Sequence, residues 1–328
     1  MRKRAEEGWT YAKAGVDIAK EAAFIRALTY EGRGFASLVE IPGCDLMMAI
    51  STDGVGTKIL VAAALQKWDT IGIDCVAMNV NDVLCVGANP VCFVDYIAAE
   101  HLDERVAAEM GRGLRRGVEM ASVQWAGGET ASLPEIVRGY DLSGTCVGIV
   151  KRDRVIHPRA DVGDLIIGIP SCGIHCNGLT LARTVVQKAG FSLNDPFPMN
   201  TERTIGEELL TPTRIYTEIL SFLDVCSDVH GLAHITGGGF LKLKRLSDRD
   251  EIGYDIYDPL PPQPIFEFLQ ECGRIETAEM FRTFNCGMGF AVAIPPSEEK
   301  TALKVLKDAK VVGEVVRRRG IWVRDTLL

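Results

Sequence analysis

The sequence predicts a mixed α/β protein of two domains. Helical and strand patterns alternate along 328 residues, a length that suits two average domains better than one. Hydrophobic residues make up 47% and charged residues 24% of the chain, as is usual for a globular protein with a large core. The patterns do not follow a strict βαβ order, so we expect mixed sheets flanked by helices.

The first domain is expected over residues 1–155. Apolar runs rich in β-branched and aromatic residues indicate its strands, and apolar residues at helical spacing indicate its helices. The strands are expected over 45–52, 91–98 and 140–151, with a further strand that starts at 123 and breaks into a turn at Gly127-Gly128-Glu129. The helices are expected over 57–68, 70–88 and 103–121.

The second domain is expected over residues 156–328, after the polar stretch KRDRVIHPRADVGD at 151–164. The alternation of patterns restarts there, which indicates a second folding unit. Its strands are expected over 164–170, 289–295 and 309–316, and its helices over 179–190, 212–224, 261–273 and 298–309.

Charge and composition exclude several classes of function. A net charge of −8 gives no general attraction to nucleic acid or to an anionic membrane, so neither is an expected partner. No apolar run reaches the length of a membrane span, and the N-terminus has no apolar segment typical of a secretory signal. The ten cysteines are scattered through apolar runs, which favours a reducing cytoplasm over a disulfide framework.

The stretch AISTDGVGTKIL, residues 49–60, combines Asp53, Gly54, Gly56, Thr57 and Lys58 between two apolar runs. The spacing matches neither the usual P-loop nor the dinucleotide fingerprint. Two glycines nevertheless permit close approach of the backbone to an anion, and a lysine beside an aspartate suits a phosphate with its Mg²⁺. A phosphate-binding loop and a tight turn between strand and helix both fit this stretch.

Further acids and amides lie where they could join Asp53. Asn79 and Asp82 are three residues apart on an expected helix and therefore share a face. Glu129 follows Gly127-Gly128 at an expected strand end, where sites are often built. Together these oxygens could hold Mg²⁺ on nucleotide phosphates. The alternative is that each acid is a helix cap or a solvated surface group.

The loop SCGIHCNG, residues 171–178, contains Cys172, His175, Cys176 and Asn177. A structural zinc site needs four ligands, usually in two pairs, and no second pair of matching spacing exists. A polar loop before a helix N-terminus would favour an anion, with His175 as donor or base. In the plain structural interpretation, Asn177 caps that helix. HGLAHITGGGF, residues 230–240, adds three glycines near two histidines, for which a turn is the plain interpretation.

Several stretches, in order along nearly the whole chain, resemble the phosphoribosylformylglycinamidine cyclo-ligases, or aminoimidazole ribonucleotide synthetases. The family belongs to an ATP-binding superfamily that includes thiamin-monophosphate kinase and a hydrogenase maturation protein. The stretches that carry the resemblance are YAKAGVDI, TDGVGTK, DTIGIDCVAMNVNDVLCVGANPVCFVDYIA, GGETASLP, YDLSGTCVGIV, HCNGLTLAR, LTPTRIY, HITGGGF and MFRTFNCGMGFAVAIP.

The resemblance implies a homodimer in which strands of the N-terminal domains form a shared barrel, with the active cleft between domains. It implies ATP-dependent closure of formylglycinamidine ribonucleotide to aminoimidazole ribonucleotide, with release of ADP and phosphate. ATP and Mg²⁺ are the implied cofactors. Two alternatives remain: a small-molecule kinase of the same superfamily, and a nucleotide-binding maturation module without turnover.

The resemblance also implies roles for individual residues. Asp53, Asp82 and Glu129 are implied as Mg²⁺ ligands, and His175, Asn177 and Lys58 as residues near the reacting groups. The nucleotide-binding residues that it implies are Lys13, Asp17, Asp53, Gly54, Gly56, Thr57, Lys58, Asn79, Asp82, Gly127, Gly128 and Glu129.

The sequence departs from the family pattern at two places. The glycine-rich stretch before the first strand is thinner here, EGRGFASLVEIP at 31–42, and Cys172 and Cys176 replace the small hydroxyl residues that the family leads us to expect.

Overall fold

A computed structural model describes residues 8–28 and 34–328. The thinner glycine-rich stretch noted above therefore lies partly outside the described residues. Mixed sheets flanked by helices, as the sequence predicts, make up the architecture. No helix of the described ranges is both long and apolar enough to cross a membrane.

The N-terminal half forms a five-stranded sheet in the order β1-β2-β5-β3-β4. All pairs are antiparallel except β3 with β4. The strands are β1 (Ser37–Glu40), β2 (Leu46–Gly54), β3 (Asn89–Ala99), β4 (Gln124–Ser132) and β5 (Tyr140–Lys151). The helices of this half are α1 (Ile18–Ala27), α2 (Lys58–Leu65), α3 (Ile71–Leu84) and α4 (Glu104–Ala121).

The C-terminal half forms a seven-stranded sheet in the order β14-β13-β10-β12-β6-β11-β9, in which only β10 and β13 are parallel. Its strands are β6 (Leu165–Pro170), β9 (Gly231–His234), β10 (Gly253–Ile256), β11 (Met288–Ile294), β12 (Lys310–Val316), β13 (Gly320–Val323) and β14 (Thr326–Leu327). A separate small hairpin pairs β7 (Pro196–Phe197) with β8 (Asn200–Thr204). The helices are α5 (Leu179–Lys188), α6 (Ile205–Leu209), α7 (Glu218–Val225), α8 (Pro264–Gly273), α9 (Thr277–Thr283) and α10 (Glu299–Val305), with 3₁₀ turns η1 (Arg152–Arg154), η2 (Gly239–Leu246) and η3 (Pro296–Glu298).

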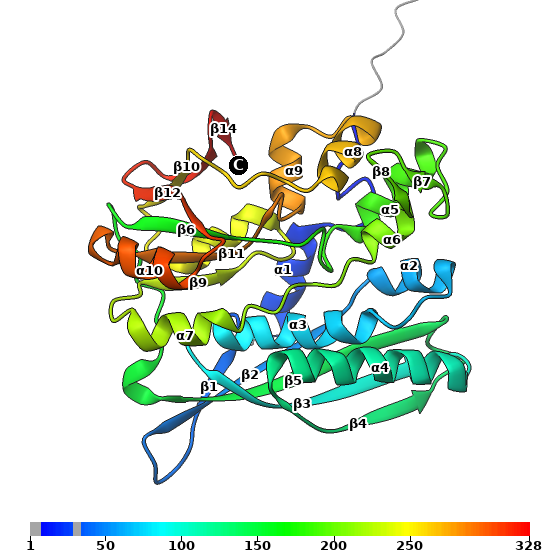
Figure 1. The fold of residues 1–328 in the computed structure, drawn as a ribbon, viewed down its shortest axis with the longest axis horizontal. Helices are drawn as coiled ribbons and strands as arrows, with labels where there is room; N and C mark the ends of the chain where they lie inside the picture. Colours follow the sequence, from blue (N-terminus) through cyan, green and yellow to red (C-terminus); the bar gives the residue numbers. More distant parts are fainter. Residues whose placement is uncertain (1–7, 29–33) are drawn as a thin grey trace, which may run out of the picture.

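Helix α3 lies between the two sheets and joins the halves (Figure 1). It contacts β2 and β5 on one side and β9 on the other. A Cβ at Gly72 would lie 2.1 Å from the backbone nitrogen of Leu114, so glycine is what allows α3 to approach α4 this closely. Every residue of α3 is buried except Asp82. Asp82 is therefore the one side chain of α3 that is partly exposed.

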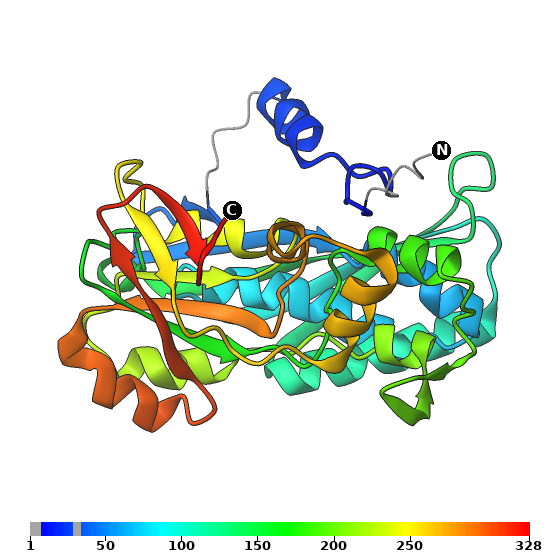
Figure 2. The ribbon, with the colours of Figure 1, turned by 90° about the horizontal axis from the view of Figure 1, so that it is seen from above.

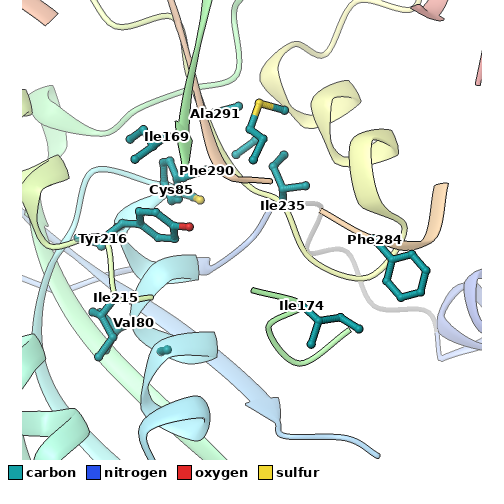
Figure 3. Packing of buried hydrophobic residues seen from close by; sticks show 14 of the residues in the cluster. Val80, Cys85, Ile169, Ile174, Ile215, Tyr216, Ile235, Phe284, Phe290 and Ala291 are labelled. Atoms are coloured by element: carbon teal, nitrogen blue, oxygen red, sulfur yellow. The ribbon is translucent and has the colours of Figure 1, made fainter. Parts of the chain in front are cut away.

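The core continues from α3 into the C-terminal sheet. Figure 3 shows Val80 of α3 near Tyr216, with Ile169 of β6 and Phe290 of β11 beyond it. The rings of Tyr216 and Phe290 lie 5.2 Å apart, and the Tyr216 side chain is fully buried. Burial of such large apolar groups typically contributes about 1.5–3 kcal/mol each, so the two halves share one stabilising core.

Figure 2 shows α1 standing away from the rest of the chain. Its side chains Phe24 and Ile25 are 69% and 54% exposed, respectively. The segment just before it is anchored, because Trp9 N donates to Gly273 O and Tyr11 N donates to Glu279 Oε1.

Two local predictions were wrong. The expected turn at Gly127-Gly128-Glu129 lies inside β4, because the parallel ladder with β3 runs on through Ser132. The helix expected from 212 begins only at Glu218, since residues 211–216 form no regular structure and are hydrogen-bonded to α3 instead. The short strands β1, β9, β10, β13 and β14 were not predicted.

Candidate active site

The end of β2 and the open side of α3 bring Asp53 and Asp82 together. Asn79 Nδ2 donates to Asp53 O at 3.1 Å and to Cys75 O at 2.8 Å, which fixes the strand end against the helix. Gly54 N donates to Asp53 Oδ1 at 2.7 Å. Burial, and next the negative charge of Asp82, raise the pKa of Asp53 to about 6. A buried carboxylate whose ionisation is disfavoured by a second carboxylate nearby is a suitable place for a divalent cation.

His234, at the end of β9, orients Asp82. Its Nδ1 lies 2.9 Å from Asp82 Oδ1, and its Nε2 lies 3.3 Å from Asn81 Nδ2. Because an amide nitrogen only donates, Nε2 must accept and Nδ1 must carry the proton that is donated to Asp82. Asn81 in turn accepts from Tyr216 N at 3.0 Å and donates to Arg214 O at 2.9 Å. The acidic pair is therefore held by both halves of the chain.

Lys58 is the first residue of α2, and its side chain is fully buried. Its Nζ donates to Asp74 Oδ1 at 2.8 Å and to Thr211 O at 2.7 Å. Asp74 Oδ1 also accepts from the backbone and the hydroxyl of Thr213, at 2.7 and 2.6 Å. This geometry does not support a phosphate contact by Lys58, because its ammonium is already used to join α2, α3 and the 211–213 segment.

The stretch between β2 and Lys58, residues 55–57, forms a tight turn. Gly56 has φ 56°, a left-handed conformation that favours glycine. The Thr57 hydroxyl lies 2.9 Å from the Thr180 hydroxyl of α5. The turn thus carries Asp53 and Gly54 to the edge of the loop that precedes α5.

In that loop, residues 171–178, His175 is buried and Asn177 is half-buried. His175 has φ 61° and is 1% exposed, and burial holds the pKa of its imidazole well below the usual range. Its Nε2 lies 3.7 Å from Cys172 Sγ. Asn177 does not cap α5, contrary to the plain structural interpretation, because Gly178 occupies the cap position with φ 76°.

Buried polar atoms of this region without a hydrogen-bond partner among the described residues include His175 Nδ1, Asn177 Nδ2 and Asn79 Oδ1. Unsatisfied buried polar atoms are costly and rare, and they often mark the place of a ligand. Asn177 lies against Gly237 of the HITGGG stretch, where a Cβ would come within 3.0 Å of Asn177 Oδ1. The site therefore draws on both glycine-rich stretches that the sequence singles out.

Glu129 is not part of this cluster within one chain. Asp53 lies in one row across the sheet with Gly144, Asp95 and Gly128, on the side that faces α3. Glu129 is one residue further along β4 and therefore projects from the opposite face. It is also three strands away from β2, about 14 Å by the usual strand spacing. The predicted set of three metal acids is thus not assembled by one chain, and residues 8–28 and 34–328 contain no cluster of three His, Cys, Asp or Glu placed for a metal.

Lys13 and Asp17 lie on the segment anchored to α8 and α9. Lys13 is exposed, with its Nζ donating to Gly8 O at 2.9 Å. A contact of either residue with a nucleotide stays a prediction.

His234 and Lys242 are site residues that the sequence interpretation did not single out. The stretch HGLAHITGGGF indicated histidines beside flexible backbone, but no pattern pairs His234 with an acid 152 positions earlier. Lys242 follows the three glycines on η2; burial and Arg245 lower the pKa of its ammonium, and the charges of Asp82 and Asp53 act against them.

Comparison with known proteins identifies the class. Residues 35–150 match the family model "AIR synthase related protein, N-terminal domain", and residues 161–325 match "AIR synthase related protein, C-terminal domain". The fold is also similar to that of a solved structure, "AaThiL complexed with AMPPCP and TMP", with a TM-score of 0.68, 16% identity, and coverage of 95% of this chain and 94% of that one. The two-sheet fold is therefore that of AIR synthase related proteins.

Closer relatives define the family within that class. A "Phosphoribosylformylglycinamidine cyclo-ligase" of Methanosarcina barkeri is 48% identical over 98% of this chain and 99% of its own length. A protein of the same name from Methanothermobacter thermautotrophicus is 48% identical over 94% of this chain and 95% of its own length. The chain belongs to the phosphoribosylformylglycinamidine cyclo-ligase family.

Proposed function

We propose that this protein closes the imidazole ring of aminoimidazole ribonucleotide from formylglycinamidine ribonucleotide, with ATP converted to ADP and phosphate. The observation that carries the proposal is the acidic pair Asp53 and Asp82 in a chain of this family. Hydrogen bonds fix the pair where the two halves meet, and Asp82 is partly exposed there. The free cysteines fit a reducing cytoplasm as the place of this step in purine synthesis.

The chemistry requires activation of a poor leaving group. Transfer of the γ-phosphoryl group to the formamide oxygen turns that oxygen into a good leaving group. The amidine nitrogen then attacks the same carbon, the C–O bond breaks, phosphate departs and a nitrogen proton is lost. The protein has to position the two ends of the substrate and stabilise phosphoryl charge, and needs no covalent nucleophile.

Asp53 and Asp82 supply the hard oxygen ligands that Mg²⁺ prefers, and a bound Mg²⁺ would neutralise phosphate charge. Asn79 fixes the backbone of Asp53, and His234 fixes the carboxylate of Asp82. His175 is neutral at physiological pH, since burial depresses its pKa. We assign its free Nδ1 and the free Nδ2 of Asn177 to hydrogen bonds with the substrate's formamide and amidine groups.

We also propose that the protein acts as a homodimer through the face of the N-terminal sheet opposite α3. Two apolar side chains of β3, Val94 and Tyr96, are two residues apart and 38% and 39% exposed. Val91, at the bulge of the same strand, is 42% exposed. An apolar sheet face of this kind is typical of a surface buried in an assembly. Glu129, on the same face, would then lie at the interface, where it could complete the Mg²⁺ site of the partner subunit.

A small-molecule kinase is the second candidate, because the fold is similar to that of AaThiL. The identity of 48% to proteins named cyclo-ligases favours ring closure. Purified protein mixed with Mg²⁺, ATP and formylglycinamidine ribonucleotide decides between them. Ring closure predicts one ADP for each dehydrated nucleotide product by mass spectrometry, whereas a phosphorylated, uncyclised product would indicate a kinase.

A further inference from the structure

The sequence interpretation expected Lys58, in the loop that carries Asp53, to contact a phosphate, but its ammonium lies in a fully buried ion pair with Asp74. A site that stabilises phosphoryl charge normally includes a lysine or arginine. The segment that follows His234 carries two other cations, Lys242 and Arg245 of η2, and the charge of Lys242 acts on both Asp53 and Asp82.

The position of η2 is set by the residues that build the site. It follows β9, whose last residue His234 bonds to Asp82. Gly239 has φ 52°, and a Cβ there would lie 2.2 Å from Phe281 O, so η2 packs tightly against α9. In a 3₁₀ helix, residues three apart lie on one face, so Lys242 and Arg245 point the same way.

Both cations lie against the ring of Phe35. The distance from the ring centroid is 5.8 Å to Lys242 Nζ and 4.6 Å to the guanidinium carbon of Arg245. Arg245 also donates to Gly34 O at 3.2 Å. Arg245 is thereby held by the chain that precedes β1, whereas the Lys242 ammonium makes no hydrogen bond or ion pair with residues 8–28 or 34–328.

Opposing charges act on the ammonium of Lys242. Burial and the positive charge of Arg245 lower the pKa of its ammonium, and the charges of Asp82 and Asp53 act in the opposite direction. Once a divalent cation occupies the two carboxylates, their attraction for Lys242 is lost, and the ammonium is left without a counter-charge. An anion with several oxygen acceptors would supply one, because it can bind the metal and accept from the ammonium at once.

We propose that Lys242 is a phosphate-binding residue of the active site, which contacts a phosphate group of ATP or of the ribonucleotide substrate. This inference rests on the proposed function for the identity of the two ligands. It assigns to η2 the charge contact that the sequence suggested for the loop at Lys58. A lysine that only offset the charge of Asp53 and Asp82 would not touch either ligand.

The variants Lys242→Met and Lys242→Arg test this, with Lys244→Met as a matched control on the exposed side of the same turn. We expect Lys242→Met to weaken binding of Mg-ATP or to raise the KM for the ribonucleotide by about tenfold or more, since a charge-assisted hydrogen bond is lost. Lys242→Arg should recover part of this loss, and Lys244→Met should show none. Calorimetric titration with Mg-ATP, Mg-ADP and adenosine reports the first ligand, and steady-state kinetics report the second.

The source of the phosphate follows from which parameter changes. Weaker Mg-ATP binding with unchanged adenosine binding assigns the contact to the triphosphate, and a rise confined to the ribonucleotide KM assigns it to the ribose phosphate. If Lys242→Met changes only the unfolding midpoint, or nothing, the inference is wrong. Wild-type protein that binds Mg-ATP through Lys242 but forms no ring-closed product would refute the proposed function and leave this phosphate contact standing.

Discussion

His234 Nδ1 lies 2.9 Å from Asp82 Oδ1, and this hydrogen bond joins the C-terminal sheet to the one partly exposed residue of α3. The imidazole is fully buried and accepts on its other side from Asn81. The orientation of the carboxylate therefore depends on how the two halves of the chain are packed.

Replacement of His234 should affect metal use more than nucleotide binding. In His234→Asn the amide nitrogen can take the place of Nδ1 and donate to Asp82, whereas His234→Leu leaves the carboxylate without that donor. We expect His234→Leu to raise the Mg²⁺ concentration for half-maximal activity about tenfold or more, and His234→Asn to raise it less. Titration of activity with Mg²⁺ at saturating ATP measures this, and equal effects of the two variants would argue against an orienting role.

Asp53→Asn should abolish activity while stabilising the metal-free protein. The pKa of Asp53 is raised from 3.8 to about 6, so the folded state pays for its ionisation above that range. The native carboxyl binds its proton more tightly than the unfolded one, and its unfavourable contribution grows as the pH rises from about 4 to 6 and is complete above 6. We expect the variant to gain about 1–3 kcal/mol at pH 8 and almost nothing at pH 4. Urea unfolding of both proteins across this pH range, without Mg²⁺, is the measurement; a pH-independent difference would contradict the assignment.

Lys58→Met should destabilise the fold rather than weaken phosphate binding. It leaves the Asp74 carboxylate buried without its cation, which typically costs about 3–5 kcal/mol. The double variant Lys58→Met with Asp74→Leu removes both charges and should recover part of the loss. Chemical denaturation of the three proteins tests this, and a stable Lys58→Met protein with a raised KM for ATP would restore the original phosphate prediction.

Val94→Asp should separate the proposed dimer. Val94 is exposed on the sheet face opposite α3, and an interfacial charge there would be desolvated without a partner. Val162→Asp, on an equally exposed valine of the C-terminal half, is the control. Sedimentation velocity should show a dimer for the wild type and the control and a monomer for Val94→Asp. A wild-type monomer, or a Val94→Asp dimer, would contradict the proposed interface.

The sequence located the acidic pair because a strand end and a helix face are local features. Asp53 closes an apolar strand, and helical spacing alone aligns Asn79 with Asp82. Glu129 was placed in the same cluster because Gly127-Gly128 suggested a turn, yet β3 supplies a ladder that keeps β4 extended and turns Glu129 to the other face. The partners of Lys58 could not be inferred, since Asp74 lies 16 residues away on another helix and Thr211 lies 153 residues away. Such contacts depend on tertiary packing, which a local pattern does not contain.

The central claim, that phosphorylation of the formamide oxygen precedes ring closure, is tested most directly by isotope transfer. Formylglycinamidine ribonucleotide labelled with ¹⁸O in its formyl group would be converted with Mg-ATP, and the released inorganic phosphate analysed by mass. The account predicts one labelled oxygen in each phosphate, because the formamide oxygen leaves bonded to phosphorus. Unlabelled phosphate accompanying ring-closed product would show that the oxygen departs without being phosphorylated, and would contradict it.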